Sequence, residues 1–229
     1  MIIKRDFDYY GANRPLHIYL PENYDFCGER YPVMYFFDGH NLFYDSDATY
    51  GKSWGLKTFL DGWSKNMIIV GMECSHVGNE RLEEYLPYPA TTNAFGPLAV
   101  KGNETLEWIV NAVKPVIDRE YRTYPFRECT GIAGSSMGGL MSLYAVLRYN
   151  KVFSRAAALS PSIWVAPERL CELVRRTPIS PDTVIYMDYG SREMGFHAEM
   201  ERFFMQLGEQ ILSRRIHLTL RIVPNGDHS

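Results

Sequence analysis

Ser136 lies in a Gly-x-Ser-x-Gly pattern, Gly134–Gly138, between a short apolar run and a stretch with apolar residues at helical spacing. The run at residues 129–134 is too short and too small for a helix, so it predicts a buried strand, and residues 140–149 predict a helix. Glycines are needed beside a serine at such a turn because a Cβ would clash with neighbouring backbone. The pattern predicts a nucleophile elbow, with Ser136 as the nucleophile and the Met137 N–H as one donor of an oxyanion hole.

The elements expected around this turn alternate between strands and helices. Runs typical of strands occupy residues 17–20, 32–37, 67–72, 130–134, 156–159, 183–187 and 217–223. Helical faces occupy residues 106–117, with a cap expected at Asn103, and residues 203–211. The alternation predicts an α/β fold with a mostly parallel sheet and helices on both faces, in which functional groups gather at the carboxyl ends of the strands.

A serine hydroxyl needs a base to take its proton, and histidine suits this task near neutral pH. His228 follows the last predicted strand, and acidic residues follow the strand before it, which gives the chain order serine, acid, histidine of the α/β-hydrolase fold. We therefore expect His228 to be the base. The remaining histidines include His17 and His217 inside predicted strands, and His76 and His197 in or beside loops.

Several segments together resemble the putative esterase family that includes esterase D, enterochelin-type trilactone esterases, feruloyl esterase domains and mycolyltransferases. The resemblance runs over nearly the whole chain and implies an α/β-hydrolase fold and a serine hydrolase that cleaves carboxylic esters through an acyl-enzyme. The segments that carry it are His17–Pro21, Asp38–Phe43, Gly134–Gly139, Ser160–Ser162 and Gly226–His228.

The resemblance also implies roles for individual residues. It places the third triad member at Glu193, in a Gly-x-x-Asp/Glu position, although Asp188 at the strand end is a rival acid. It places the second oxyanion N–H at His40, after Asp38, which we expect to brace the turn. Arg81 lies in a segment bordering the pocket of the family and is a candidate for substrate binding or loop anchoring.

Aromatic residues gather in the loops expected over the site. Such side chains can stack on a sugar or aryl group, or they can pack a lid, and the sequence leaves both interpretations open. We take Trp54 and Trp164 as candidate substrate contacts. The other members of this set are Phe43, Tyr44, Tyr50, Tyr85, Tyr88 and Phe95.

Composition argues against several classes of partner. With 24 basic and 27 acidic residues the net charge is −3, and no basic stripe is present, so we expect neither nucleic acid nor a membrane surface as partner. The start of the chain lacks the apolar core of a signal peptide, so we expect a cytoplasmic protein. Four scattered cysteines without Cys-x-x-Cys spacing predict reduced thiols, and we expect no metal and no cofactor.

The chain ends one residue after His228, whereas a further helix follows the histidine loop in this family and fold. We expect one α/β-hydrolase domain over residues 1–229 that lacks a C-terminal helix beyond Ser229. Residues 225–229 should then be more mobile than the Ser136 turn, or His228 should be displaced from Ser136.

A small-molecule ester is the expected substrate of a serine esterase with this site. An acyltransferase on the same fold, or a non-catalytic binding protein, are the alternatives. The acyl group, the alcohol and the oligomeric state stay open.

Overall fold

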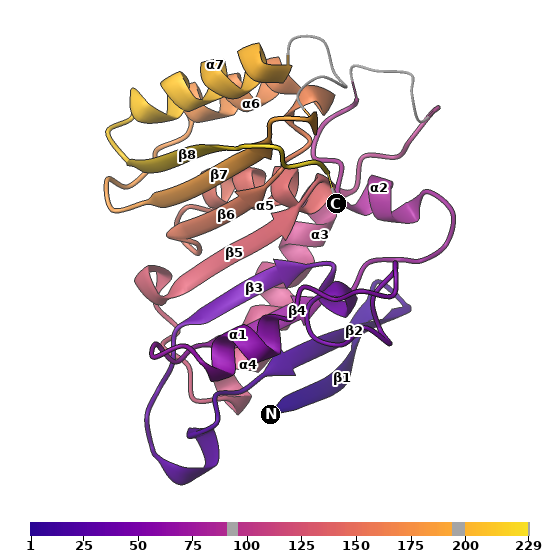
Figure 1. The fold of residues 1–229 in the computed structure, drawn as a ribbon, viewed down its shortest axis with the longest axis vertical. Helices are drawn as coiled ribbons and strands as arrows, with labels where there is room; N and C mark the ends of the chain where they lie inside the picture. The colour runs from indigo at the N-terminus through magenta and orange to yellow at the C-terminus, as the bar shows by residue number, and fades with distance from the viewer. Residues whose placement is uncertain (91–95, 194–199, 229) are drawn as a thin grey trace.

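A single mixed sheet organises the molecule. In the computed structural model, which describes residues 1–90, 96–193 and 200–228, eight strands run in the order β1-β2-β4-β3-β5-β6-β7-β8 (Figure 1). The strands β1, β2 and β4 are antiparallel neighbours, and all pairs from β4 to β8 are parallel. The bounds are β1 (Ile2–Tyr9), β2 (Ala12–Tyr19), β3 (Val33–Phe37), β4 (Ile68–Met72), β5 (Thr130–Ser135), β6 (Arg155–Leu159), β7 (Val184–Gly190) and β8 (His217–Val223). The predicted mostly parallel α/β sheet is confirmed.

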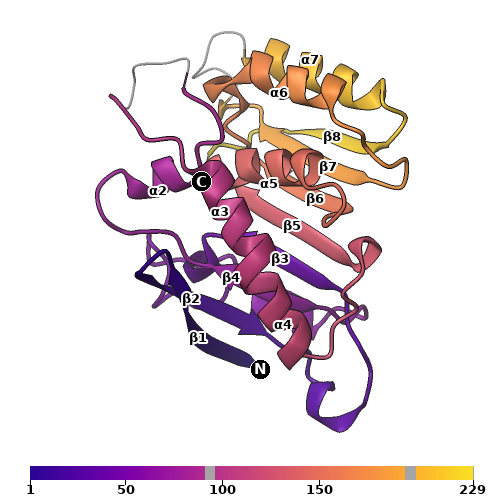
Figure 2. The same cartoon turned by 180° about the vertical axis from the view of Figure 1, so that it is seen from behind.

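Helices cover both faces of this sheet, as expected. The face seen in Figure 1 carries α1, and the face seen in Figure 2 carries α3, α4 and α5. The helix bounds are α1 (Leu56–Asp61), α2 (Glu80–Glu84), α3 (Gly102–Trp108), α4 (Lys114–Glu120), α5 (Met137–Arg148), α6 (Pro167–Arg176) and α7 (Met200–Leu212). A π-helical turn at Ile109–Val113 joins α3 to α4. Within the described ranges, none of these helices is long and apolar enough to cross a membrane.

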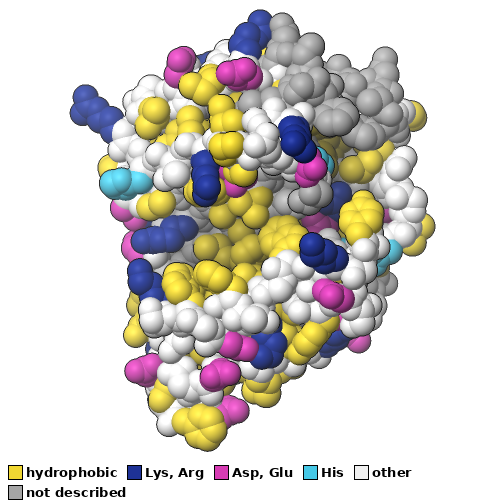
Figure 3. Space-filling model, viewed as in Figure 1, with side chains coloured by type: hydrophobic (Ala, Val, Ile, Leu, Met, Phe, Trp, Pro, Cys, Tyr) yellow, Lys and Arg dark blue, Asp and Glu magenta, His cyan; other side chains and the backbone are white. Residues whose placement is uncertain are grey.

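Strand β3 shows how the two faces of the sheet differ. Alternate side chains of a strand point to opposite faces of the sheet. The face that packs against the helices of Figure 2 receives the fully buried side chains of Val33, Tyr35 and Phe37. Met34 and Phe36 point to the α1 side and stay half-buried beside a smaller apolar cluster. Hydrophobic side chains are accordingly visible in a hollow on that face (Figure 3).

From the sequence, one strand was missed and one helix start was predicted wrongly. Strand β1 was not predicted, because its alternating charged residues give it a polar outer side at the edge of the sheet. The expected Asn103 cap is wrong: α3 begins at Gly102 after Lys101. The Gly102 N–H donates to the Leu86 carbonyl oxygen at 2.9 Å, and a Cβ on Gly102 would lie 2.8 Å from that backbone, so contact with Leu86 sets the helix start.

Candidate active site

Ser136 occupies a sharp turn between β5 and α5. Its backbone has φ 55° and ψ −120°, a conformation that non-glycine residues rarely adopt. A Cβ on Gly134 would lie 2.7 Å from the Gly138 carbonyl carbon, and one on Gly138 would lie 2.9 Å from Phe37 Cβ. Glycine at both positions therefore lets the strand, the turn and the helix pack this closely, and the first residue of α5 is Met137.

Three predicted residues meet above this turn. His228 Nε2 lies 3.0 Å from Ser136 Oγ, and His228 Nδ1 lies 2.6 Å from Glu193 Oε2. The Glu193 side chain is only 5% exposed, whereas the His228 side chain is 50% exposed. The serine, the imidazole and the buried carboxylate form a continuous line of contacts, and its carboxylate end lies inside the protein.

The two acidic candidates have different partners. Glu193 contacts His228 through Oε2, while its Oε1 accepts hydrogen bonds from Ser160 Oγ at 2.6 Å and from the Gly190 N–H. Asp188 instead accepts a hydrogen bond from the Ser160 N–H at 3.1 Å and another from a neighbouring tyrosine hydroxyl. Of the two carboxylates, Glu193 is the one in contact with the imidazole.

The loop that carries His228 is attached to the loop after β7. The Arg192 N–H donates to the Gly226 carbonyl oxygen at 2.9 Å. Gly190 packs on the same backbone so closely that a Cβ there would overlap Gly226. The expectation that His228 is displaced from Ser136 is therefore wrong, because the adjoining loop holds the histidine loop at Gly226. Ser229 lies outside the described residues.

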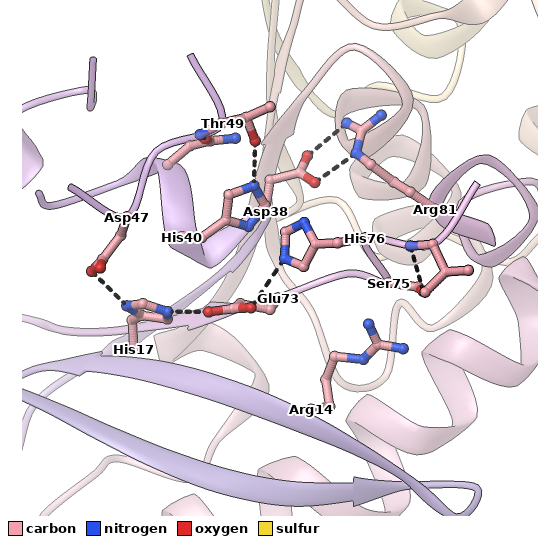
Figure 4. A network of polar contacts seen from close by, with 12 residues as sticks. Arg14, His17, Asp38, His40, Asp47, Thr49, Glu73, Ser75, His76 and Arg81 are labelled. Atoms are coloured by element: carbon pink, nitrogen blue, oxygen red, sulfur yellow. Dashed lines mark hydrogen bonds and ion pairs between the residues drawn. The ribbon is translucent and has the colours of Figure 1, made fainter. Parts of the chain in front are cut away.

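A second loop, Gly39–Asn41 with Asp38 before it, packs beside the Ser136 turn. Asp38 has a left-handed backbone with φ 58°, and its carboxylate pairs with Arg81 through Nε at 2.7 Å and Nη2 at 2.8 Å (Figure 4). Burial opposes the charge of Arg81, but the Asp38 carboxylate outweighs it and raises the pKa of the guanidinium. Arg81 thus anchors the Asp38 loop, and its contact with substrate stays a prediction.

His40 is buried in this loop. Its Nε2 lies 2.9 Å from Thr49 Oγ1, and burial lowers the pKa of the imidazole below its ordinary value, although Asp38 opposes this shift. A Cβ on Gly138 would lie 3.3 Å from Asp38 Oδ2, so the loop packs against the first turn of α5. The backbone of His40 and that of Met137 therefore belong to neighbouring segments.

The two tryptophans have separate surroundings. Trp54 packs edge-to-face on Phe36, with ring centroids 6.2 Å apart. Trp164 is half-buried in the short turn Ile163–Val165, directly after Ser162. Substrate contact by either ring stays a prediction. Phe95 and His197 lie outside the described residues.

Two serines near the site were not assigned a role from the sequence. Ser160, with φ 42°, donates to Glu193, and Ser162 Oγ lies 3.3 Å from Ser136 Oγ. Both follow β6 in a segment that carries the family resemblance, and the rule that polar residues after parallel strands share one edge could have given them a role.

Comparison with known proteins places the chain in a family. The model of the family described as putative esterase matches residues 8–229. The uncharacterized protein YbbA of Bacillus subtilis is 26% identical over 204 residues, which is 88% of this chain and 77% of that protein.

Solved structures share the fold. An IroE-like serine hydrolase from Shewanella oneidensis has a TM-score of 0.80 at 20% identity, covering 100% of this chain and 75% of that one. The enterobactin esterase FES from Shigella flexneri has a TM-score of 0.77 at 18% identity, covering 100% of this chain and 55% of that one. The chain therefore has an α/β-hydrolase fold, belongs to the putative esterase family and is a carboxylic-ester hydrolase.

Proposed function

We propose that this chain cleaves small carboxylic esters through an acyl-enzyme on Ser136, with His228 as base and Glu193 as the acid that orients it. The observation that carries this proposal is the line of contacts from Ser136 Oγ through the imidazole to the buried carboxylate. A serine, a histidine and a carboxylate in this spatial arrangement perform acyl transfer on unrelated folds. Their roles follow from their geometry and not from their order in the sequence.

The proton moves along this line in the first step. Glu193 accepts the Nδ1–H of His228, which leaves Nε2 unprotonated and able to receive the proton of Ser136 Oγ. The serine oxygen then bonds to the ester carbonyl carbon, and the buried carboxylate stabilises the imidazolium that forms. His228 returns the proton to the departing alcohol, and the acyl group stays on Ser136.

Water completes the cycle by the same route. His228 takes a proton from a water molecule, the hydroxide attacks the acyl-enzyme, and the serine recovers its proton as the acid leaves. In both steps we assign the negative carbonyl oxygen to the backbone N–H groups of Met137 and His40. The packing of the Asp38 loop against the start of α5 supports this pair, because both segments then border the same space.

The substrate class is a small ester whose alcohol and acyl group are to be found by assay. The structural neighbour from Shigella is an enterobactin esterase, which supports including a siderophore trilactone. A panel of nitrophenyl, feruloyl, acetyl-sugar and trilactone esters, with and without an added alcohol, would measure kcat/KM for each and separate hydrolysis from acyl transfer to the alcohol.

The adjacent serines provide a matched test. Ser136→Ala removes the proposed nucleophile and should lower kcat by several orders of magnitude while the fold is retained. Ser135→Ala changes the neighbouring side chain at the end of β5 and should cost far less. Equal losses in the two variants would refute Ser136 as the nucleophile.

A further inference from the structure

Three side chains with metal-binding atoms lie together beside the Asp38 loop. One ring nitrogen of His40, the Cys74 sulfur and one ring nitrogen of His76 all lie within 4.8 Å of one another. Strands β3 and β4 are parallel neighbours with Phe37 opposite Met72, so the loops that follow them start side by side. The sheet register therefore brings together residues that are far apart in the sequence.

His40 presents an unused nitrogen in this cluster. The residue is only 5% exposed, and its Nδ1 has no hydrogen-bond partner among the described residues. Its Nε2 contacts Thr49 Oγ1, which fixes the ring, and in the tautomer that donates from Nε2 the other nitrogen, Nδ1, carries a lone pair. A buried polar atom without a partner is uncommon in folded proteins and indicates an ion or water at that position.

His76 faces His40 from the solvent side. The two rings meet edge-to-face with centroids 4.7 Å apart (Figure 4), and the His76 side chain is 56% exposed. His76 Nε2 lies 3.2 Å from Glu73 Oε2, and the other oxygen of Glu73 lies 2.6 Å from His17 Nε2. A carboxylate behind a histidine orients the ring and increases its basicity, which is the usual support of a metal-ligating histidine.

We propose that His40, Cys74 and His76 bind one Zn²⁺ ion, with water in the fourth position. Two imidazoles and a thiolate are donors that zinc prefers, and three protein ligands leave one site open. When the ion binds, the Cys74 thiol loses its proton to solvent and both imidazoles coordinate in the neutral form.

Coordination requires a modest movement of the exposed ligand. Zinc lies about 2.0–2.1 Å from nitrogen and about 2.3 Å from sulfur, so the three ligand atoms must approach one another more closely than 4.8 Å. His40 and Cys74 are buried, so the movement falls to the exposed side chain of His76. This proposal departs from the expectation of no metal, which rested on spacing within the sequence and took no account of ligands from two separate loops.

The site would stiffen the segment that carries the His40 backbone N–H. Zinc would join the loop after β3 to the loop after β4, beyond the existing pair of Asp38 with Arg81. Because the ion binds the folded chain, it should also raise the thermal midpoint of unfolding. Binding and melting need no ester substrate, so they report on this site whether or not the proposed catalytic roles hold.

The test is a titration of tag-free, metal-free protein with ZnCl₂ by calorimetry, repeated with Co²⁺ and read by absorbance. We expect one ion per chain, a thiolate-to-cobalt charge-transfer band, and a higher melting midpoint with zinc. Cys74→Ser should remove the band, and Cys74→Ser and His76→Ala should each weaken zinc binding at least tenfold. Cys171→Ser, at another buried cysteine, and His217→Ala, at an exposed histidine, should bind as the parent does.

Each result decides the proposal. Absence of saturable zinc binding in the parent would overturn it, and so would binding that Cys74→Ser or His76→Ala leaves unchanged, since the ion would then sit elsewhere on the surface. Circular dichroism checks the fold of each variant. If Cys74→Ser does not fold, His76→Ala decides alone, because its exposed side chain can be removed without opening the core.

Discussion

Replacing Glu193 by glutamine tests how the carboxylate acts on His228. Glu193 Oε1 accepts two hydrogen bonds, from Ser160 Oγ and from the Gly190 N–H. An amide NH₂ cannot accept them, so the glutamine in Glu193→Gln keeps its oxygen there and turns its NH₂ toward His228 Nδ1. The imidazole must then accept at Nδ1 and carry its proton on Nε2, where it cannot receive the proton of Ser136.

The size of this effect follows from the known cost of the wrong tautomer. In the reference serine protease triad the acid-to-amide change lowers kcat about 10⁴-fold. Here His228 is half exposed, so some molecules can turn the ring toward water and regain the reactive tautomer. We expect a loss of about 10³-fold to 10⁴-fold in kcat, or about 4–5.5 kcal/mol of transition-state stabilisation.

Asp188→Asn is the matched control. Asp188 Oδ1 accepts the Ser160 N–H, and Oδ2 accepts the hydroxyl of Tyr186, which can rotate to accept from an amide instead. We expect less than about a tenfold loss in kcat. The assay is hydrolysis of a nitrophenyl ester at fixed pH, with thermal melts to confirm folding. The opposite ranking would move the acid to Asp188, and two small losses would indicate a Ser136–His228 dyad.

Three further changes probe the supporting structure. Gly190→Ala places a Cβ against the Gly226 backbone in the loop that carries His228, and it should lower kcat at least about 100-fold. Gly28→Ala, with open space around it, should leave kcat unchanged. Equal activity of the two variants would contradict the role of the contact between Gly190 and Gly226. Arg81→Met leaves the buried Asp38 carboxylate unpaired and should reduce the free energy of unfolding in urea by about 2–3 kcal/mol, and no change would refute the anchoring role. Burial raises the pKa of Tyr9 to about 12, so the stability gained from its neutral form is present below pH about 10 and is lost as the pH rises toward 12. The free energy of unfolding in urea should therefore fall less between pH 9 and pH 11.5 in Tyr9→Phe than in the parent protein. An equal fall in the two proteins would contradict this.

The residues that were predicted well from the sequence are those fixed by local pattern. The Ser136 turn follows from glycine spacing between a strand and a helix, and the candidate positions of Glu193 and His228 follow from the strands before them. Chain order then places these loops at one edge of a parallel sheet. The family resemblance favoured Glu193 over its rival Asp188, and the structure has Glu193 in contact with His228, whereas Asp188 lies within β7 and accepts from the Ser160 N–H.

Features that depend on register between distant segments were not predicted. The close packing of Gly190 on Gly226 holds the histidine loop, and nothing near Gly226 in the sequence indicates this partner. The meeting of His40 with Cys74 and His76 depends likewise on the alignment of β3 with β4. Strand β1 was missed because its pairing with β2 determines its structure more than its own apolar content does.

Covalent labelling tests the central claim, that Ser136 is the nucleophile of a serine esterase, most directly. Folded protein would be treated with a fluorophosphonate, and the adduct would be located by intact mass and peptide mapping. We predict one phosphonyl group per chain, on Ser136, with no adduct in Ser136→Ala and a retained adduct in Ser135→Ala. A folded parent protein that takes up no label, or takes it up on another residue, would contradict the account.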